Sequence, residues 1–473
     1  MQISNISLTY PNFKWDGLRY TGWHIHPYNL GLLSAVIGDK YSMSIIDSDS
    51  EDLTREDFSR RLKDNKPDIL GISLIANEYA NSGLIAAEIA KETDPNIKTI
   101  VGGVSATSNP LFFIKNPNVD YVVMGEGEYV FRDLCNFLNQ EGDLPKKGIM
   151  YKENEKIVDN GKADLIEDLN KLPLPSYHLV DFKKYTNKTQ RESVDRPRAM
   201  PYARIRTSRG CPFNCCFCEV GSISGKKPRL RSLESVAKEL EWLIGNYSIK
   251  GLMFDDDNLV VDKKRSKDLF KMMIDRNYGL KWSAPGMAVY LLDEEMISLM
   301  KESGSTFLNI AIESGNQRVL SNIIHKPLDL KKSKKTIKKI KEYGIDLAAN
   351  FVIGFPGETF DEVRETIKFA EDIDVDYVKI YIATPFPHTE LYKIAKDGGY
   401  LREGFDNNKH LWTEGWITSD KFRYQDLKIL RAYEWDRINF SNPEKRKKIA
   451  KMMDVTEGRL DEIRKETLKI VNP

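Results

Sequence analysis

Short apolar runs alternate with helical patterns along the first part of the chain. The expected strands are Ile3–Leu8, Ser42–Asp47, Ile69–Ile75, Lys98–Val101 and Tyr121–Met124. Between them, apolar residues recur every three or four positions, which is typical of one face of a helix. This alternation predicts a parallel, doubly wound sheet over about residues 1–142. Ligands of such sheets bind at the carboxyl ends of the strands, where two glycine-containing turns fall.

The same alternation resumes after a stretch of different character. We interpret residues 143–200 as a connector with a small hairpin and a proline-rich crossing segment. Later strands are expected at Ile205–Thr207, Lys250–Phe254, Lys281–Ala284, Phe307–Ile312, Leu347–Ile353 and Tyr377–Ile382. Six β/α units over about 201–395 are fewer than the eight of a closed barrel, so a partial barrel is predicted. Residues 396–473 mix aromatic and charged residues and predict a mostly helical extension.

Composition narrows the class of protein. The chain has 473 residues and a net charge of +1, so it is expected to have several domains and no broad basic face for nucleic acid. Five cysteines are too few for a disulfide framework, and four of them lie within 211–218. The first residues do not resemble a secretion signal, and no apolar run is long enough to span a bilayer. We therefore expect a soluble, cytoplasmic protein. The lysine-rich stretch Lys331–Lys341 is interpreted as a solvated helix face.

The cysteine-rich loop carries the strongest chemical signal. Cys211, Cys215 and Cys218 are separated by three and then two residues, after a glycine and around a proline that favour a tight loop. Three soft thiolates can hold three corners of an iron–sulfur cube and leave the fourth iron open to a substrate. A structural zinc site would need four ligands, and the adjacent Cys215 and Cys216 are hard to aim at one tetrahedron. Cys216 and Cys135 are interpreted as packed thiols.

This motif, with an aromatic residue before its last cysteine, resembles the radical S-adenosylmethionine (SAM) superfamily. The resemblance extends over the second α/β unit. It implies a [4Fe-4S] cluster whose open iron binds SAM, and whose electron splits SAM into methionine and a 5′-deoxyadenosyl radical. An external electron donor of flavodoxin or ferredoxin type is then expected. The radical removes a hydrogen atom from an unactivated carbon, a step beyond side-chain acid–base chemistry.

Further motifs at strand ends match the same family. Asp256 and Asp257 follow the second strand of this unit and resemble the acidic residues that receive the SAM ammonium. As an alternative, the run of aspartates would cap the next helix. Glu313 resembles the residue near the SAM ribose or carboxylate, and no arginine matches the usual carboxylate ligand near Lys281. The expected SAM-binding residues are Phe217, Asp256, Asp257, Glu313, Ile353, Gly354 and Gly357.

The amino-terminal unit resembles the Rossmann-like cobalamin-binding (B12-binding) domain that precedes the radical SAM core in one large subclass. The resemblance implies a bound cobalamin. No histidine motif for ligating cobalt from below is present, and residues near Leu74–Asn77 would meet the lower face. His24 and His26 are interpreted as packed loop residues. The expected cobalamin-binding residues are Ser73, Leu74, Ile75, Gly102, Gly103, Ser105, Gly125, Glu126 and Gly127. A Rossmann-like domain without cofactor is the alternative.

Together these resemblances predict a cobalamin-dependent methyltransferase that acts on an unactivated carbon of a small-molecule or lipid substrate. One alternative is a cobalamin-dependent radical cyclase or oxidoreductase without methyl transfer. Another is a cobalamin-binding sensor without catalysis. An RNA-modifying methylthiotransferase is disfavoured, because such enzymes carry three further amino-terminal cysteines and residues 1–134 contain none. The sequence identifies neither the substrate nor the oligomeric state.

Overall fold

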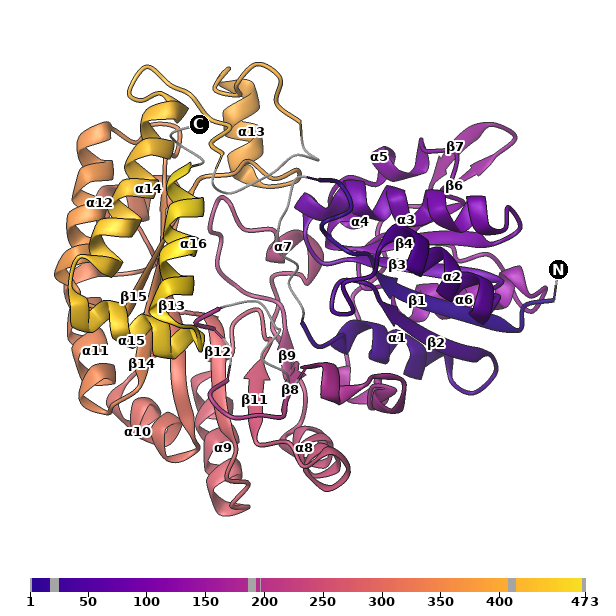
Figure 1. The fold of residues 1–473 in the computed structure, drawn as a ribbon, viewed down its shortest axis with the longest axis horizontal. Coiled ribbons are helices and arrows are strands. Elements are labelled where there is room, and N and C mark those ends of the chain that lie inside the picture. Colours follow the sequence, from indigo (N-terminus) through magenta and orange to yellow (C-terminus); the bar gives the residue numbers. More distant parts are fainter. Residues whose placement is uncertain (1, 18–24, 186–192, 196, 407–413, 470–473) are drawn as a thin grey trace. The chain divides into compact units, whose positions relative to one another are not determined.

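A computed structural model describes residues 2–17, 25–185, 193–195, 197–406 and 414–469. The chain forms two compact units. The first comprises Met1–Arg191 with Asp406–Lys409, and the second comprises Glu192–Phe405 with His410–Pro473. Figure 1 shows both units, with the first in indigo to magenta and the second in magenta to yellow.

The first unit is built on a seven-stranded sheet with the strand order β2-β1-β3-β4-β5-β6-β7. Its strands are β1 Asn5–Tyr10, β2 Ser42–Asp47, β3 Ile69–Leu74, β4 Lys98–Gly103, β5 Tyr121–Val123, β6 Ile149–Glu153 and β7 Lys156–Asp159. Strands β1 to β5 pair in parallel, as predicted, and β6 and β7 are antiparallel. Its helices are α1 Tyr28–Ile37, α2 Arg55–Asn65, η1 Asn77–Tyr79, α3 Ala80–Thr93, α4 Val104–Ser108, α5 Pro110–Ile114, α6 Glu128–Leu138, η2 Leu169–Lys171, η3 Tyr177–Leu179 and η4 Phe182–Tyr185.

Two separate apolar cores cover the faces of this sheet. One contains Leu30 from α1 with Phe131 and Leu134 from α6. The other contains Phe58 from α2 and Ala86 from α3. Every residue of β3 is buried, which explains its unbroken apolar run. Helices on both faces of a mostly parallel sheet confirm the doubly wound architecture.

The predicted hairpin extends this sheet. Strand β6 pairs with β5 and β7 pairs with β6, so the sheet continues beyond residue 142, where the sequence pattern predicts its end. The backbone N–H of Ala163 donates to the carbonyl of Met124 at 2.9 Å, which fastens the following segment to the same unit. The first unit therefore runs to Arg191. Most of the predicted connector belongs to it, because its backbone hydrogen bonds are made with the sheet.

The second unit contains a six-stranded parallel sheet with the order β15-β14-β13-β12-β11-β8. Its strands are β8 Tyr202–Ile205, β11 Gly251–Phe254, β12 Lys281–Met287, β13 Ser305–Glu313, β14 Asp346–Ile353 and β15 Tyr377–Ile382, and β9 Ser208–Arg209 pairs with β10 Arg229–Leu230. The sheet joins no seventh or eighth strand, so the partial barrel is confirmed for the part of the chain that is described.

Helices α8 to α12 form the outer layer of this sheet (Figure 1). The helices of the unit are α7 Val220–Ile223, α8 Leu233–Tyr247, α9 Lys263–Asp275, η5 Val289–Leu291, α10 Glu294–Glu302, the π-helix η6 Val319–Ile324, α11 Leu330–Glu342, α12 Phe360–Asp372, α13 Glu390–Asp397, α14 Tyr424–Phe440, α15 Pro443–Met453 and α16 Glu457–Lys469. The last three confirm the predicted helical extension. No helix within the described ranges is long and apolar enough to cross a membrane.

Side chains of helix α14 bind backbone groups of β15, the edge strand of the partial barrel. The side chain of Asn439 accepts from the backbone N–H of Val378 at 2.8 Å and donates to its carbonyl at 2.9 Å. The guanidinium of Arg431 donates to the carbonyl of Ile380 at 3.0 Å. These side chains provide the partners that a further strand would provide.

Candidate metal centre and cofactor-binding residues

The cysteine loop begins at a backbone position that requires glycine. Gly210 has a φ of +91°, and a Cβ there would meet the carbonyl oxygen of Lys227 at 2.6 Å. The next residue, Cys211, donates its backbone N–H to the carbonyl of Gly225 at 3.2 Å. The segment between helix α7 and strand β10 therefore holds the start of the loop.

The three predicted cluster ligands lie close enough to influence one another's ionisation. Burial raises the pKa of the Cys211 and Cys215 thiols. Cys218 is exposed at its surface, while the protein atoms around its sulfur raise its thiol pKa to about 12. Thiols with raised pKa values are protonated at neutral pH, so metal binding here must displace protons.

Among the residues that the structure describes, no three His, Cys, Asp or Glu side chains converge tightly enough to hold a single metal ion. Each cysteine of an iron–sulfur cube binds a different iron, so the sulfur atoms of such a site need not converge on one point. Cys216 is buried, its backbone N–H donates to the carbonyl of Ile324 at 3.0 Å, and its carbonyl accepts from Leu391. It therefore anchors the loop as a packed residue. The soft thiol set formed by the other three fits a cluster.

The two aspartates after β11 hold the strand that leads into the loop. Asp256 is buried and accepts from the backbone N–H of Thr207 at 3.2 Å, from its hydroxyl at 2.8 Å, and from the hydroxyl of Ser208. Burial raises the pKa of Asp256 despite these bonds. Asp257 accepts from the backbone N–H of Gly210 at 2.7 Å through Oδ2.

The carboxylates of Asp256 and Asp257 differ in whether both of their oxygen atoms already accept hydrogen bonds. Asp257 makes no hydrogen bond through Oδ1 with any described residue, whereas both oxygens of Asp256 accept from Thr207. The alternative that this run caps the next helix is wrong, because Asp262 is the N-cap of α9.

A buried ion pair lies beside the cysteine loop. The ammonium of Lys326 lies 3.1 Å from a carboxylate oxygen of Glu313, and both side chains are less than 10% exposed. Burial alone would lower the pKa of Lys326, but the charges of Glu313 and Cys215 outweigh it and hold the pKa above its ordinary value. Glu313 ends β13 with a φ of 72°, a left-handed conformation that is strained for this residue type.

Lys326 is the functional candidate that sequence reasoning missed. It follows the π-helix η6 and precedes a proline, between the buried Ile324 and Leu328. A lysine flanked by buried apolar residues was the available signal. Its partner is 13 positions away along the chain, so only the fold reveals the pair.

The turn after β14 meets the cysteine loop. The ring centroids of Phe217 and Phe355 are 5.9 Å apart. Gly354 has a φ of +90°, and a Cβ there would lie 2.5 Å from a methyl group of Leu427. The buried carboxylate of Glu358 accepts from the backbone N–H groups of Gly354 at 2.6 Å and Phe355 at 3.0 Å, and burial raises its pKa to about 7. Of the predicted SAM-binding residues, Asp256 and Asp257 follow β11, Glu313 ends β13, and Ile353, Gly354 and Gly357 lie at the end of β14 and in the turn after it, all at the carboxyl edge of one parallel sheet. Phe217 reaches this edge through its contact with Phe355.

The predicted cobalamin-binding residues also lie at the carboxyl ends of strands. Ser73 and Leu74 pair with Gly102 and Gly103, and Ile75 follows them. A Cβ on Gly103 would meet the carbonyl oxygen of Leu74 at 2.5 Å, so the two strands approach closely here. This close approach of two strands is sufficient to explain why residue 103 is glycine, whether or not a ligand binds here. Ser105 is buried in α4.

The turn after β5 is covered by the unit's own chain. The carboxylate of Glu126 accepts from the backbone N–H of Ile166 at 2.7 Å, and a Cβ on Gly125 would lie 3.2 Å from the backbone of Ala163. Gly127 starts helix α6. His26 is packed against the rings of Tyr177, Phe182 and Tyr185, in agreement with its interpretation as a packing residue, and His24 lies outside the described residues.

Comparison with known proteins agrees with this division of the chain. Residues 205–370 match the family model of the radical SAM superfamily, and residues 18–135 match that of the B12 binding domain. The chain is 34% identical over 399 residues to an uncharacterised methyltransferase of Pyrococcus horikoshii, covering 84% of each. It is 28% identical over 447 residues to the cytidylyl-2-hydroxyethylphosphonate methyltransferase of Streptomyces wedmorensis, covering 83% of this chain and 80% of the relative. It is 26% identical over 400 residues to the anaerobic magnesium-protoporphyrin IX monomethyl ester cyclase of Rubrivivax gelatinosus, covering 82% and 69%.

Solved structures share the fold. The cobalamin-dependent SAM radical enzyme OxsB aligns with a TM-score of 0.72 at 15% identity, covering 99% of this chain and 72% of OxsB. The radical SAM methyltransferase TsrM of Kitasatospora setae aligns with a TM-score of 0.67 at 17% identity, covering 85% and 76%. With the match to the Pyrococcus protein and the two domain matches, the chain belongs to the radical SAM superfamily and, within it, to the family of cobalamin-dependent enzymes that includes methyltransferases.

Proposed function

We propose that this enzyme uses SAM and cobalamin to methylate an unactivated carbon of a small molecule or lipid. The observation that supports the SAM site most strongly is the buried Lys326–Glu313 pair beside Cys215. A buried charged pair next to three thiols has little structural rationale, because its desolvation offsets much of its attraction. The relatives named as methyltransferases favour methyl transfer as the outcome.

The amino-acid end of SAM meets two charged groups. Lys326 pairs with the SAM carboxylate, a role for which the segment Lys281–Ala288 offers no arginine. Asp257 receives the SAM ammonium through Oδ1, since its other oxygen already holds Gly210. Asp256 does not contact SAM in this proposal. It positions the start of the cysteine loop by accepting hydrogen bonds from Thr207 and Ser208.

The nucleoside end of SAM meets neutral surfaces and one carboxylate. Glu313 accepts from a ribose hydroxyl, and the turn Ile353–Gly357 meets the adenine with its backbone. Glu358 fixes this turn by accepting two of its N–H groups. Phe217 closes the side toward the cluster by its contact with Phe355.

Three thiolates would hold the cluster: Cys211, Cys215 and Cys218. The cobalamin would be held by the strand ends and turns of the first unit, at Ser73, Leu74, Ile75, Gly102, Gly103, Ser105, Gly125, Glu126 and Gly127. When bound, the cluster supplies the electron that splits SAM, and the cobalamin carries the methyl group. The protein's part is to orient SAM, to displace water from around the charged pair and to present the substrate carbon.

The test uses anaerobically reconstituted enzyme, methyl-labelled SAM and candidate substrates. We expect equal amounts of 5′-deoxyadenosine, S-adenosylhomocysteine and labelled product. The variant Cys215→Ala should form none of them, whereas Cys216→Ala should retain the activity, since that thiol packs without binding iron. Labelled product that still forms with Cys215→Ala would contradict the proposal.

A radical cyclase or oxidoreductase without methyl transfer is the second candidate, favoured by the likeness to the cyclase of Rubrivivax gelatinosus. The same assay separates the two. Deoxyadenosine formed without S-adenosylhomocysteine would support the second candidate. Cobalamin binding without any SAM cleavage under dithionite would instead indicate a sensor.

A further inference from the structure

Helix α11 carries an unusual concentration of positive charge. Its 13 residues include seven lysines: Lys331, Lys332, Lys334, Lys335, Lys338, Lys339 and Lys341. The chain as a whole has a net charge of only +1, so this density does not reflect a basic protein. Ser333, Ile337 and Ile340 form the buried face of the helix.

Four of these lysines are exposed and make no ion pair with any described residue: Lys331, Lys332, Lys335 and Lys338. We call them the lysine face. Lys334 is also exposed and pairs at 3.7 Å with Asp372, and Lys339 and Lys341 pair with acidic side chains of the same unit.

Helix stability does not explain the lysine face. Lys331 and Lys332 lie in the first turn, where the helix dipole favours acidic residues. This turn has none, although the N-cap Asp329 precedes it and accepts from the backbone N–H of Lys332 at 2.9 Å. Lys331 and Lys335, like Lys334 and Lys338, are four positions apart, where like charges repel. Positive charge that weakens its own helix points to a partner outside the chain.

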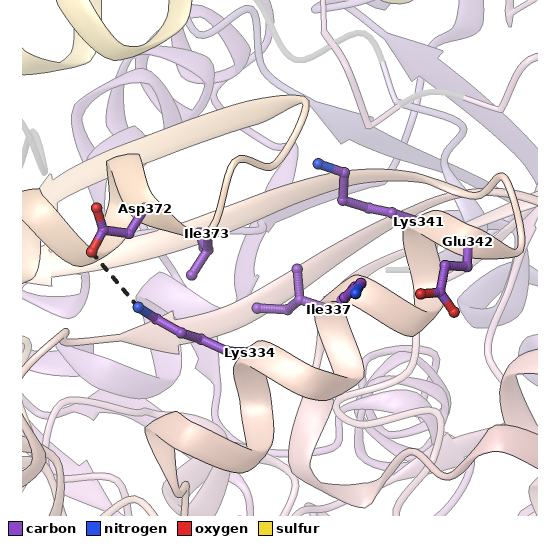
Figure 2. A pocket seen from close by; sticks show the side chains of 7 residues that line it. Lys334, Ile337, Lys341, Glu342, Asp372 and Ile373 are labelled. Carbon is purple, nitrogen blue, oxygen red and sulfur yellow. Dashed lines mark ion pairs between the residues drawn. The ribbon is translucent and has the colours of Figure 1, made fainter.

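A groove lies beside the lysine face. Figure 2 shows it between α11 and the end of α12, lined by Lys334, Ile337, Lys338, Lys341, Glu342, Asp372 and Ile373. It has a volume of about 430 Å³, and its lining combines two isoleucines and three lysines with the carboxylates of Glu342 and Asp372. Lys334 and Lys341 in this lining are already paired with Asp372 and Asp374, so an acidic partner is expected at the lysine face rather than in the groove.

The start of α11 is fastened at the edge of the sheet where the cysteine loop lies. The backbone N–H of Leu330 donates to the side chain of Gln317 at 3.2 Å, and Gln317 donates to the carbonyl of Leu328 at 2.8 Å. Six residues before the helix, the carbonyl of Ile324 accepts from the backbone N–H of Cys216. Lys331 is five residues from the buried Lys326, so their Cα atoms are at most about 18 Å apart.

We propose that the lysine face is the docking surface for a small acidic flavoprotein of the flavodoxin type that reduces the cluster. The inference rests on the proposed function, because SAM cleavage takes one electron from outside the chain. At this surface, the reduced flavin gives up one electron and the cluster gains it. Opposite charges raise the rate of encounter and set the orientation of docking.

The test reverses the charge of the surface with the triple variant Lys331→Glu, Lys332→Glu and Lys335→Glu. The matched control is Lys238→Glu, Lys451→Glu and Lys465→Glu, which makes the same change at exposed lysines without ion pairs on α8, α15 and α16. Both are reconstituted and compared with wild type in SAM cleavage driven by reduced flavodoxin or by dithionite. Isothermal titration calorimetry with oxidised flavodoxin measures binding without turnover.

We expect the α11 variant to raise the KM for flavodoxin at least 10-fold and to raise the dissociation constant of flavodoxin by the same factor. Its rate of SAM cleavage with dithionite should equal that of wild type. The control should match wild type, and the wild-type KM should rise with salt. An unchanged KM in the α11 variant would overturn the docking surface. Lysine-dependent reduction by an acidic ferredoxin but not by flavodoxin would overturn the choice of partner. Absence of SAM cleavage in dithionite by wild type would instead count against the proposed function.

Discussion

At the scale of single residues, the central feature is a lysine buried beside thiols. Lys326 keeps its charge because Glu313 lies 3.1 Å away and Cys215 is close. In our account it is a binding group for the SAM carboxylate. In this proposal Lys326 makes the carboxylate contact for which the segment Lys281–Ala288 offers no arginine.

The variant Lys326→Met should weaken SAM binding about 10- to 100-fold, the range expected for a charge-assisted hydrogen bond. Lys326→Met also leaves the buried carboxylate of Glu313 without its ion-pair partner, which can lower stability. The double variant Lys326→Met with Glu313→Gln removes that unpaired charge and is the matched control for stability. Lys326→Arg should recover part of the affinity. The measurement is the dissociation constant of SAM for the reconstituted protein. Equal affinity in wild type and Lys326→Met would exclude the assigned role.

Asp47, at the end of β2, gives a second prediction at this scale. It is buried and accepts from the hydroxyl of Tyr185, and burial raises its pKa to about 6. The folded state therefore binds more protons than the unfolded state between about pH 4 and pH 6, so the contribution of Asp47 to stability is largest below pH 4 and is lost as pH rises through 6.

Asp47→Asn should remove this part of the pH dependence. The unfolding free energy of the variant minus that of wild type should be up to about 3 kcal/mol larger at pH 7 than at pH 4. Urea unfolding of both proteins at the two pH values measures the difference. A stability difference between the proteins that does not change with pH would show that Asp47 titrates normally.

At the scale of elements, the period of the apolar residues was sufficient to predict most strands and helices. Strands Ser42–Asp47 and Tyr377–Ile382 have the predicted bounds. The second alternates buried and half-buried positions, which is typical of a strand. The hairpin β6–β7 was predicted, but its pairing with β5 was not, since strand pairing depends on tertiary contacts. The anchoring of the cysteine loop by Asp256 and Asp257 also joins segments 47 or more positions apart, which no local pattern reveals.

Helix α14 provides the prediction at this scale. Asn439→Ala leaves the backbone N–H and carbonyl of Val378 without their partners at the sheet edge. We expect a loss of about 2–4 kcal/mol in unfolding free energy, since each unpaired buried group costs about 1–3 kcal/mol. Asn246→Ala, on the exposed side of α8, is the control and should change stability by less than about 0.5 kcal/mol. Equal losses in both variants would contradict the role of α14 as an edge cap.

At the scale of the whole molecule, two units with different chemistry are joined in one chain. The first has the doubly wound sheet of the B12 binding domain, and the second has the partial barrel of the radical SAM superfamily. The family and its cofactors were predictable from the cysteine spacing and the order of motifs at strand ends. The substrate was not, because relatives of similar sequence have different named activities, so the fold does not determine it. Methyltransferases and a cyclase occur among them.

The most direct test of the central claim is electron paramagnetic resonance of the reduced, reconstituted protein with and without SAM. We predict about four irons per chain and a [4Fe-4S] signal whose g-values change when SAM binds the open iron. The signal should disappear in the triple variant Cys211→Ala, Cys215→Ala and Cys218→Ala and persist in Cys216→Ala. A signal unaffected by SAM, or one that survives the triple variant, would contradict the account.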